Sequence, residues 1–137
     1  MPRGSKTILG VEDEDIVRSL ITNTLTRAGY SVLQADRPSE ALRICESHQE
    51  RIDLMLADVV MPEMNGRELA ERVVRMRRIG VVYMSRFTDA AIGTDGILPP
   101  DVQLIEKPFA EELLLETIRN YLDSATDHGT LDGPDAG

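Results

Sequence analysis

Hydrophobic residues follow two alternating patterns along the chain: short apolar runs, and longer stretches whose apolar positions recur with a helical period. The apolar runs predict strands at KTILGV (6–11), YSVLQA (30–35), IDLMLA (52–57), VVYM (81–84) and VQLI (102–105). The stretches between them predict helices over 16–29, from Pro38 through Cys45, over 66–77 and over 110–123. Strands that alternate with helices indicate an α/β fold, with helices on both faces of an open parallel sheet.

Glycine and proline punctuate this pattern. Gly29 follows the first helix as a C-terminal stop, and Pro38 stands where the first turn of a helix tolerates proline. The segment TDAAIGTDGILPP (88–100) leaves room for only a short helix between the fourth and fifth strands. The sequence therefore predicts a disordered leader at MPRGS (1–5), a single folded domain over 6–123, and a flexible acidic tail at SATDHGTLDGPDAG (124–137).

Composition and charge narrow the function. The chain has 137 residues, of which 42% are hydrophobic and 28% charged, and its net charge is −9. This composition suits one globular domain, and the negative charge would repel a phosphate backbone, so we expect no nucleic-acid binding. No apolar run approaches the length of a membrane span, and the N-terminus lacks the apolar core of a signal peptide. We therefore expect no membrane association.

Few cysteine and histidine side chains are available for redox or metal chemistry. Cys45 is the only cysteine, which excludes an intramolecular disulfide and suits a reducing cytoplasm, where we expect the protein to be. The only histidines are His48 and His128, so a histidine-rich metal site is excluded.

Polar side chains capable of chemistry follow four of the five predicted strands. They are Glu12, Asp13 and Glu14 after the first, Asp58 after the third, Ser85 after the fourth, and Glu106 and Lys107 after the fifth. Each has an ordinary explanation when taken alone: Asp13 as a helix cap, Ser85 as a turn residue, Lys107 as a solvated cation. Parallel strands, however, present their carboxyl ends at one edge of the sheet, where ligands bind. We therefore expect these side chains to converge on one crevice.

Such a crevice would favour a divalent cation and a phosphoryl group. Two carboxylates about 5 Å apart repel by about 3 kcal/mol at an effective dielectric near 20. Three carboxylates, from Glu12, Asp13 and Asp58, suit a hard cation, Mg²⁺ or else Mn²⁺. Phosphoryl oxygens could then meet Lys107 and the Ser85 hydroxyl, and a carboxylate can act as the nucleophile. The pattern predicts Asp58 as a phosphoacceptor.

The motifs ILGVEDED, DLMLADVVMPEMNGRELA, VVYMS and EKPF make the chain resemble the receiver domain of response regulators over nearly all of residues 6–123. YMSRFTDAAI followed by EKPF is most similar to receivers at the C-terminus of hybrid histidine kinases. The resemblance implies a flavodoxin-like (βα)5 doubly wound parallel sheet of order 2-1-3-4-5. It also implies phosphotransfer to Asp58 from the phosphohistidine of a sensor or hybrid histidine kinase, or of a histidine phosphotransfer protein. We expect no conventional enzyme, only Mg²⁺-dependent self-phosphorylation and autodephosphorylation, in a monomer or weak dimer that switches its partner interactions.

The resemblance also assigns roles to individual residues. Asp13 would bind Mg²⁺ directly, and Glu12 would do so directly or through water. Asp58 would be both ligand and phosphoacceptor, and the backbone carbonyl of Val60 would complete the protein ligands. Ser85 and Lys107 would hold the phosphoryl oxygens. The peptide bond from Lys107 to Pro108 would be cis.

Three positions depart from the family pattern. Glu12 replaces the commoner first aspartate, and Leu104 stands where many receivers carry an aromatic residue that swings inward on phosphorylation. Arg86 replaces the small residue that normally follows the serine or threonine. It is either a surface arginine that pairs with Asp89 or a gate at the mouth of the crevice.

Three other functions would use part of the same pattern. A degenerate receiver would keep the fold without phosphorylation, but Asp13, Asp58, Ser85 and Lys107 are all present. An aspartate-nucleophile phosphohydrolase would need a second acid two residues after Asp58, where this chain has Val60. A calcium loop at EDEDIVRSLITN would need glycine at its sixth position and glutamate at its twelfth, and the chain has Val17 and Asn23 there.

Overall fold

The computed structural model describes residues 6–86 and 103–136, with side chains described up to residue 124. The five strands in these residues are β1 (Thr7–Val11), β2 (Ser31–Ala35), β3 (Leu54–Asp58), β4 (Gly80–Arg86) and β5 (Leu104–Lys107). The helices are α1 (Asp15–Arg27), α2 (Pro38–Ser47), α3 (Gly66–Met76) and α5 (Glu111–Ala136). The short helix predicted within 88–100 lies outside the described residues.

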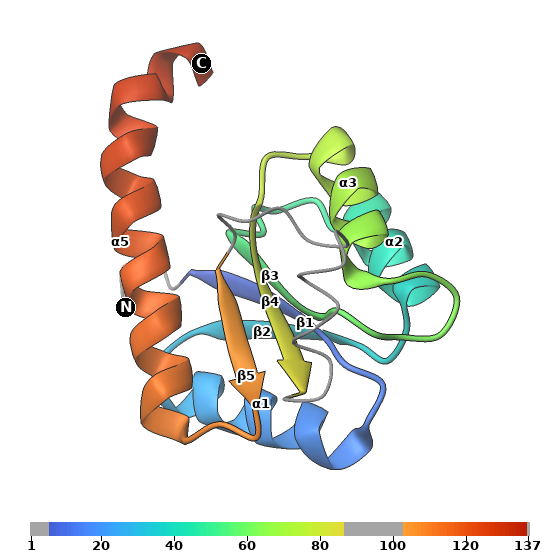
Figure 1. Ribbon diagram of the computed structural model, residues 1–137. Coiled ribbons are helices and arrows are strands. Elements are labelled where there is room, and N and C mark those ends of the chain that lie inside the picture. The colour runs from blue at the N-terminus through green and yellow to red at the C-terminus, as the bar shows by residue number, and fades with distance from the viewer. Residues whose placement is uncertain (1–5, 87–102, 137) are drawn as a thin grey trace.

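The strands form one parallel sheet in the order β2-β1-β3-β4-β5. This confirms the predicted α/β architecture and its strand order. Figure 1 shows α1 and α5 on one side of the sheet and α2 and α3 on the other. Because all strands run the same way, their carboxyl ends share one edge of the sheet. The arrowheads of β4 and β5 point to this edge in Figure 1.

Alternation along the strands builds a hydrophobic core on each face of the sheet. Ile8 packs with α1 and α5, whereas its neighbour Leu9 packs with α2 and α3. β3 is buried at all five positions, so it reads as a continuous apolar run ending in Asp58. Both faces of the central strands are thus closed to water, and only their ends reach a solvent-facing edge.

Local signals set where the helices begin and end. Gly29, which follows the C-cap residue Ala28 of α1, has a φ of +102°, and Pro38 opens α2, as the sequence predicted. At the start of α3, the Asn65 side chain accepts from the Glu68 amide at 2.9 Å, and the Glu68 carboxylate accepts from the Asn65 amide at 3.1 Å. This capping box fixes the first turn of α3 beside the end of β3.

The last helix extends further than the sequence predicted. The pattern indicated a helix that ends at residue 123 and a flexible tail over 124–137, but α5 continues to Ala136. Neither glycine nor proline occurs between Asp123 and His128. The helical hydrogen-bond ladder therefore has nothing to interrupt it at the predicted boundary, even though the apolar periodicity stops there.

Candidate phosphorylation and metal site

The edge at the carboxyl ends of β1, β3, β4 and β5 brings together side chains from distant parts of the sequence. Asp58 ends β3 opposite Met84, and Ser85 lies opposite Glu106 in the next pair of strands. Glu12 directly follows β1, and its amide still donates to the carbonyl of Ala35 at 3.1 Å. The predicted convergence at one edge of the sheet is therefore present.

Lys107 stands at the centre of this group. Its Nζ atom donates to Asp58 Oδ2 at 2.9 Å and to Glu12 Oε1 at 3.0 Å. The Lys107 side chain is only 6% exposed. Lys107 is therefore not a solvated surface cation, which was the explanation for this residue when taken alone. A buried ammonium that bridges two buried carboxylates holds all three groups in fixed positions.

Burial and mutual repulsion shift the pKa values of these groups. Burial, followed by the charge of Asp58, raises the pKa of Glu12 to about 7, although hydrogen bonds from the Glu14 amide and Lys107 oppose the shift. Burial also raises the pKa of Asp58 against the opposing hydrogen bond from Lys107. Burial would lower the pKa of Lys107, but its bonds to Asp58 and Glu12 outweigh this and raise it. The positive charge of Lys107 thus offsets only part of the negative charge of the acids.

The acidic cluster has the chemistry of a divalent-cation site. One carboxylate oxygen from each of Glu12, Asp13 and Asp58 lies within 4.8 Å of the others. Asp58 Oδ1 is buried and accepts no hydrogen bond from the described residues, and Asp13 is exposed. An orphaned buried oxygen beside an accessible carboxylate fits a hard cation with oxygen ligands and water.

Glu12 is less available than the other two acids. It is fully buried, and its oxygens accept from Lys107 and, at 3.0 Å, from the Glu14 amide. Each of its oxygens keeps a second lone pair, so these bonds do not exclude a metal ion or a metal-bound water. The arrangement is compatible with both roles that the resemblance implies for Glu12.

Ser85 and Val60 complete the set of predicted site residues. Ser85 lies in β4, is buried, and donates its hydroxyl to the carbonyl of Arg86 at 3.1 Å. Val60 follows Asp58 by two residues, at the start of the loop that leads to α3, and its side chain is half-exposed. The Lys107–Pro108 bond is cis, as the resemblance implied.

Sequence analysis missed the role of Glu14. Arg86, at the end of β4, pairs with Glu14, and Glu14 Oε1 also lies 3.7 Å from Lys107 Nζ. The predicted partner of Arg86, Asp89, lies outside the described residues. The sequence did place Glu14 among the acids after the first strand, but a contact between residues 72 positions apart has no periodic signal.

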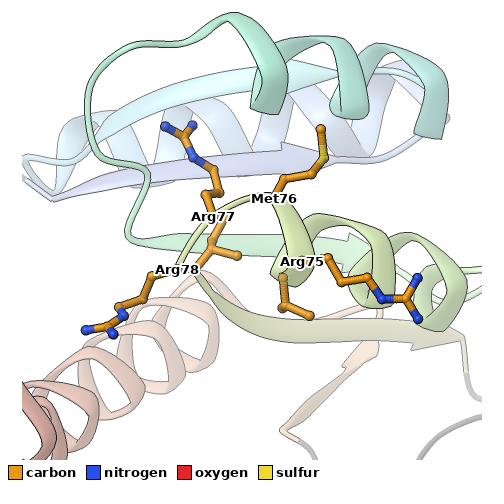
Figure 2. Close-up of a pocket in the computed structure, with 6 residues that line it drawn as sticks. Arg75, Met76, Arg77 and Arg78 are labelled. Carbon is orange, nitrogen blue, oxygen red and sulfur yellow. The ribbon is translucent and has the colours of Figure 1, made fainter. Parts of the chain in front are cut away.

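A second concave region lies away from the acidic cluster. It encloses about 520 Å³ at the end of α3 and is lined by residues 74–79. Figure 2 shows three arginines there, Arg75, Arg77 and Arg78, with Met76. Arg77 is held by the carbonyls of His48 and Glu50 at 2.9 and 3.0 Å. This basic region offers cations but no acid or nucleophile from its six lining residues.

Known proteins resemble this chain over most of its length. Residues 8–119 match the family of the response regulator receiver domain. The chain belongs to this family. It is 32% identical to the response regulator receiver protein CpdR of Brucella abortus, covering 88% of this chain and 99% of that protein. It is 35% identical to the sensor kinase CckA of Brucella abortus, again over 88% of this chain but only 13% of the kinase.

Solved receiver domains have the same fold. The receiver domain of the hybrid histidine kinase CckA superposes with a TM-score of 0.71 at 32% identity, covering 85% of this chain and 98% of that one. A response regulator receiver protein from Sinorhizobium medicae gives a TM-score of 0.75 at 26% identity, covering 87% and 95% of the two chains. Among its described residues, this receiver domain has no helix that is both long and apolar enough to span a bilayer.

Proposed function

We propose that Asp58 accepts a phosphoryl group and that this modification switches the interactions of the receiver domain with a partner. The observation that carries the proposal is the position of Asp58. It is a 5%-exposed carboxylate bonded to Lys107 through one oxygen, while its other oxygen accepts no hydrogen bond from the described residues. One oxygen is thus fixed and the other remains available as a nucleophile.

The chemistry is a nucleophilic displacement at phosphorus. An oxygen of Asp58 forms the new P–O bond as the P–N bond of a phosphohistidine breaks, and the leaving imidazole nitrogen keeps the bonding electron pair. Lys107 lies within hydrogen-bond reach of Asp58 and can donate to a phosphoryl oxygen, and Ser85 can turn its hydroxyl from the Arg86 carbonyl to another. Hydrolysis reverses the modification when water attacks phosphorus and the P–O bond to Asp58 breaks.

A divalent cation would be held by Asp13 and Asp58, with Glu12 through water and the backbone carbonyl of Val60 as further ligands. Bound Mg²⁺, or Mn²⁺, would offset the charge of the carboxylates and of the incoming phosphoryl oxygens. The close approach of the three carboxylates and the single compensating lysine support this assignment. Asp13 is the most accessible of the three acids, so it would provide the entry point for the ion.

The donor would be a histidine kinase or a histidine phosphotransfer protein. The similarity to the receiver protein CpdR and to the receiver of CckA supports a module that acts within a phosphorelay. Because the chain spans only 13% of the sensor kinase, the activity of the whole kinase does not transfer to it. The receiver would be modified by its partner and would catalyse only its own phosphorylation and dephosphorylation.

The test is uptake of phosphate from a small donor such as phosphoramidate, followed by intact mass. We expect one added phosphoryl group in the wild type with Mg²⁺, little without it, and none in Asp58→Asn. Asp53→Asn serves as the control and should be modified normally, because Asp53 precedes β3 at the opposite end of the strand from Asp58 and lies outside the cluster. An unmodified wild type with Mg²⁺ and excess donor would identify a degenerate receiver instead.

A further inference from the structure

Glu14 and Arg86 form an ion pair that bridges the β1–α1 connection and the end of β4. Glu14 belongs to the connection from β1 to α1, and Arg86 is the last residue of β4. Their side chains pair, and Glu14 also approaches Lys107, which in turn contacts Asp58. A chain of charged contacts thus runs from Arg86 through Glu14 and Lys107 to Asp58.

The orientation of Glu14 points to this bridge rather than to a role in the helix. Glu14 occupies the position just before α1, where a side chain commonly caps the first amides of the helix. Its side chain makes no such cap bond and extends to Arg86 and Lys107 instead.

The bridge is weak enough to open. The Arg86 and Glu14 side chains are 55% and 40% exposed, whereas the side chains of Asp58 and Lys107 are almost fully buried. Exposed ion pairs contribute little free energy because water and salt screen them. A pair of this kind does not stabilise the fold much, but it can decide what fraction of the time the crevice is open.

We propose that the Glu14–Arg86 pair is a latch that limits access to Asp58, so that it slows both the gain and the loss of the phosphoryl group. The inference rests on the proposed function of Asp58. Uptake needs a donor whose P–N bond breaks as the P–O bond to Asp58 forms. Loss needs a water molecule on the phosphorus atom, which breaks that P–O bond and releases phosphate. Both reactions would be affected, because Glu14 and Arg86 stand after β1 and at the end of β4, on the same edge of the sheet as Asp58.

The latch differs from two other effects of the same residues. If Arg86 instead left Glu14 to pair with the phosphoryl oxygens, its removal would speed loss but slow uptake. If only the local field mattered, an anionic donor would react more slowly without Arg86 and faster without Glu14. The latch alone predicts that removing either partner speeds both reactions.

The experiment compares wild type, Arg86→Gln, Glu14→Gln and the double variant with phosphoramidate at saturating Mg²⁺, whose affinity is measured for each. Intact mass follows uptake, and hydrolysis is followed after the donor is removed. An exposed pair that contributes up to about 1 kcal/mol corresponds to a two- to sixfold increase in both rates when it is lost. The double variant should match the single variants. Arg43→Gln, which removes the exposed Arg43–Glu40 pair on α2, is the matched control and should leave both rates unchanged.

Each other outcome overturns the latch. Unchanged rates in both single variants would show that the pair does not limit access, and rate changes in opposite directions would show a field effect. Faster hydrolysis with slower uptake in Arg86→Gln would show phosphoryl pairing, and additive effects in the double variant would show two independent roles. Glu14→Gln tests the latch by itself if Arg86→Gln proves less stable on thermal melting. Absence of uptake in the wild type would instead refute the proposed function.

Discussion

Lys107 and the acids around it form the part of the site where single atoms matter most. Its ammonium group lies 2.9 Å from Asp58 and 3.0 Å from Glu12, and Glu14 is 3.7 Å away. A buried charge is tolerated only when it is paired, so the lysine and the two buried acids depend on each other. Among the described residues no ion pair compensates Asp13, because Lys107 contacts the other acids. The unmatched charge of the cluster is therefore centred on the side that faces solvent.

Asp13→Ala should abolish the stabilisation that Mg²⁺ gives to the fold. An ion that binds only the folded state raises stability by about 2.7 kcal/mol at a concentration a hundred times its Kd. We expect added Mg²⁺ to raise the melting temperature of the wild type, and chelation with EDTA to reverse the rise. The exposed acid Glu46 on α2 supplies the control, since Glu46→Ala should keep the full response. A Mg²⁺ response that survives in Asp13→Ala would show that the ligand assignment is wrong.

The sequence predicted the positions of Asp58, Asp13 and Lys107 because a parallel sheet presents all its strand ends at one edge. That rule needs only the order of the apolar runs. It could not predict the pairing of Arg86 with Glu14, because side-chain torsions across two loops leave no periodic trace. Nor could it show that Glu12 is already engaged by two hydrogen bonds.

At the scale of elements, the junction of β3 and α3 positions the acceptor. The backbone of α3 begins so close to the end of β3 that a Cβ atom on Gly66 would lie 2.5 Å from the carbonyl oxygen of Asp58. The Gly66 amide also donates to the carbonyl of Val59 at 2.7 Å. Because the obstructing atoms are backbone, they cannot rotate away. Gly66 is thus the residue that allows α3 to pack against the phosphorylation site.

Gly66→Ala should therefore disturb both the fold and the site. We expect a loss of about 1–3 kcal/mol in the free energy of unfolding, measured with urea, together with weaker Mg²⁺ binding. Gly10→Ala on β1 is the matched control, since its new Cβ would meet Ile21 at an ordinary 3.7 Å. That change should be neutral or slightly stabilising. Equal stability in the two variants would mean that the β3–α3 junction relaxes easily.

Helix ends were predicted less well than strand order. The alternation of elements predicted the parallel sheet, but the strand order came from the family resemblance, because right-handed crossovers are compatible with more than one order. The end of α5 depends instead on backbone hydrogen bonding beyond the last core contact. Leu122 is the last buried side chain described in this helix, so apolar periodicity stops near the boundary that the sequence suggested. The backbone continues as a helix to Ala136 although the apolar periodicity has ended.

The whole molecule carries charge unevenly. Acids gather at the carboxyl edge of the sheet, whereas Arg75, Arg77 and Arg78 line the concave region at the end of α3. Figure 1 also shows α5 projecting beyond the body of the domain, away from the edge to which β4 and β5 point. Under the proposed function, a change at Asp58 would begin at the carboxyl edge of the sheet. Leu104 on β5 is 41% exposed and offers no aromatic ring to relay it.

We predict that phosphorylation leaves β5 nearly unchanged. Hydrogen exchange of the receiver with and without beryllofluoride and Mg²⁺ would measure this, and we expect little change in β5. Changes should fall mainly in the segment 88–100, which lies outside the described residues. Asp58→Asn provides the control, since it should show no response to beryllofluoride. Protection changes concentrated in residues 102–106 would contradict the prediction and place the switch in the fifth strand.

The central claim, that Asp58 is the phosphoacceptor, is tested most directly by locating the modified residue. Hydroxylamine converts an acyl phosphate to a hydroxamate, which peptide mass spectrometry assigns to one side chain. After reaction with phosphoramidate and Mg²⁺, our account predicts a hydroxamate at Asp58 and at no other acid. A hydroxamate at Glu12 or Asp13, or a phosphoryl group that resists hydroxylamine, would contradict it.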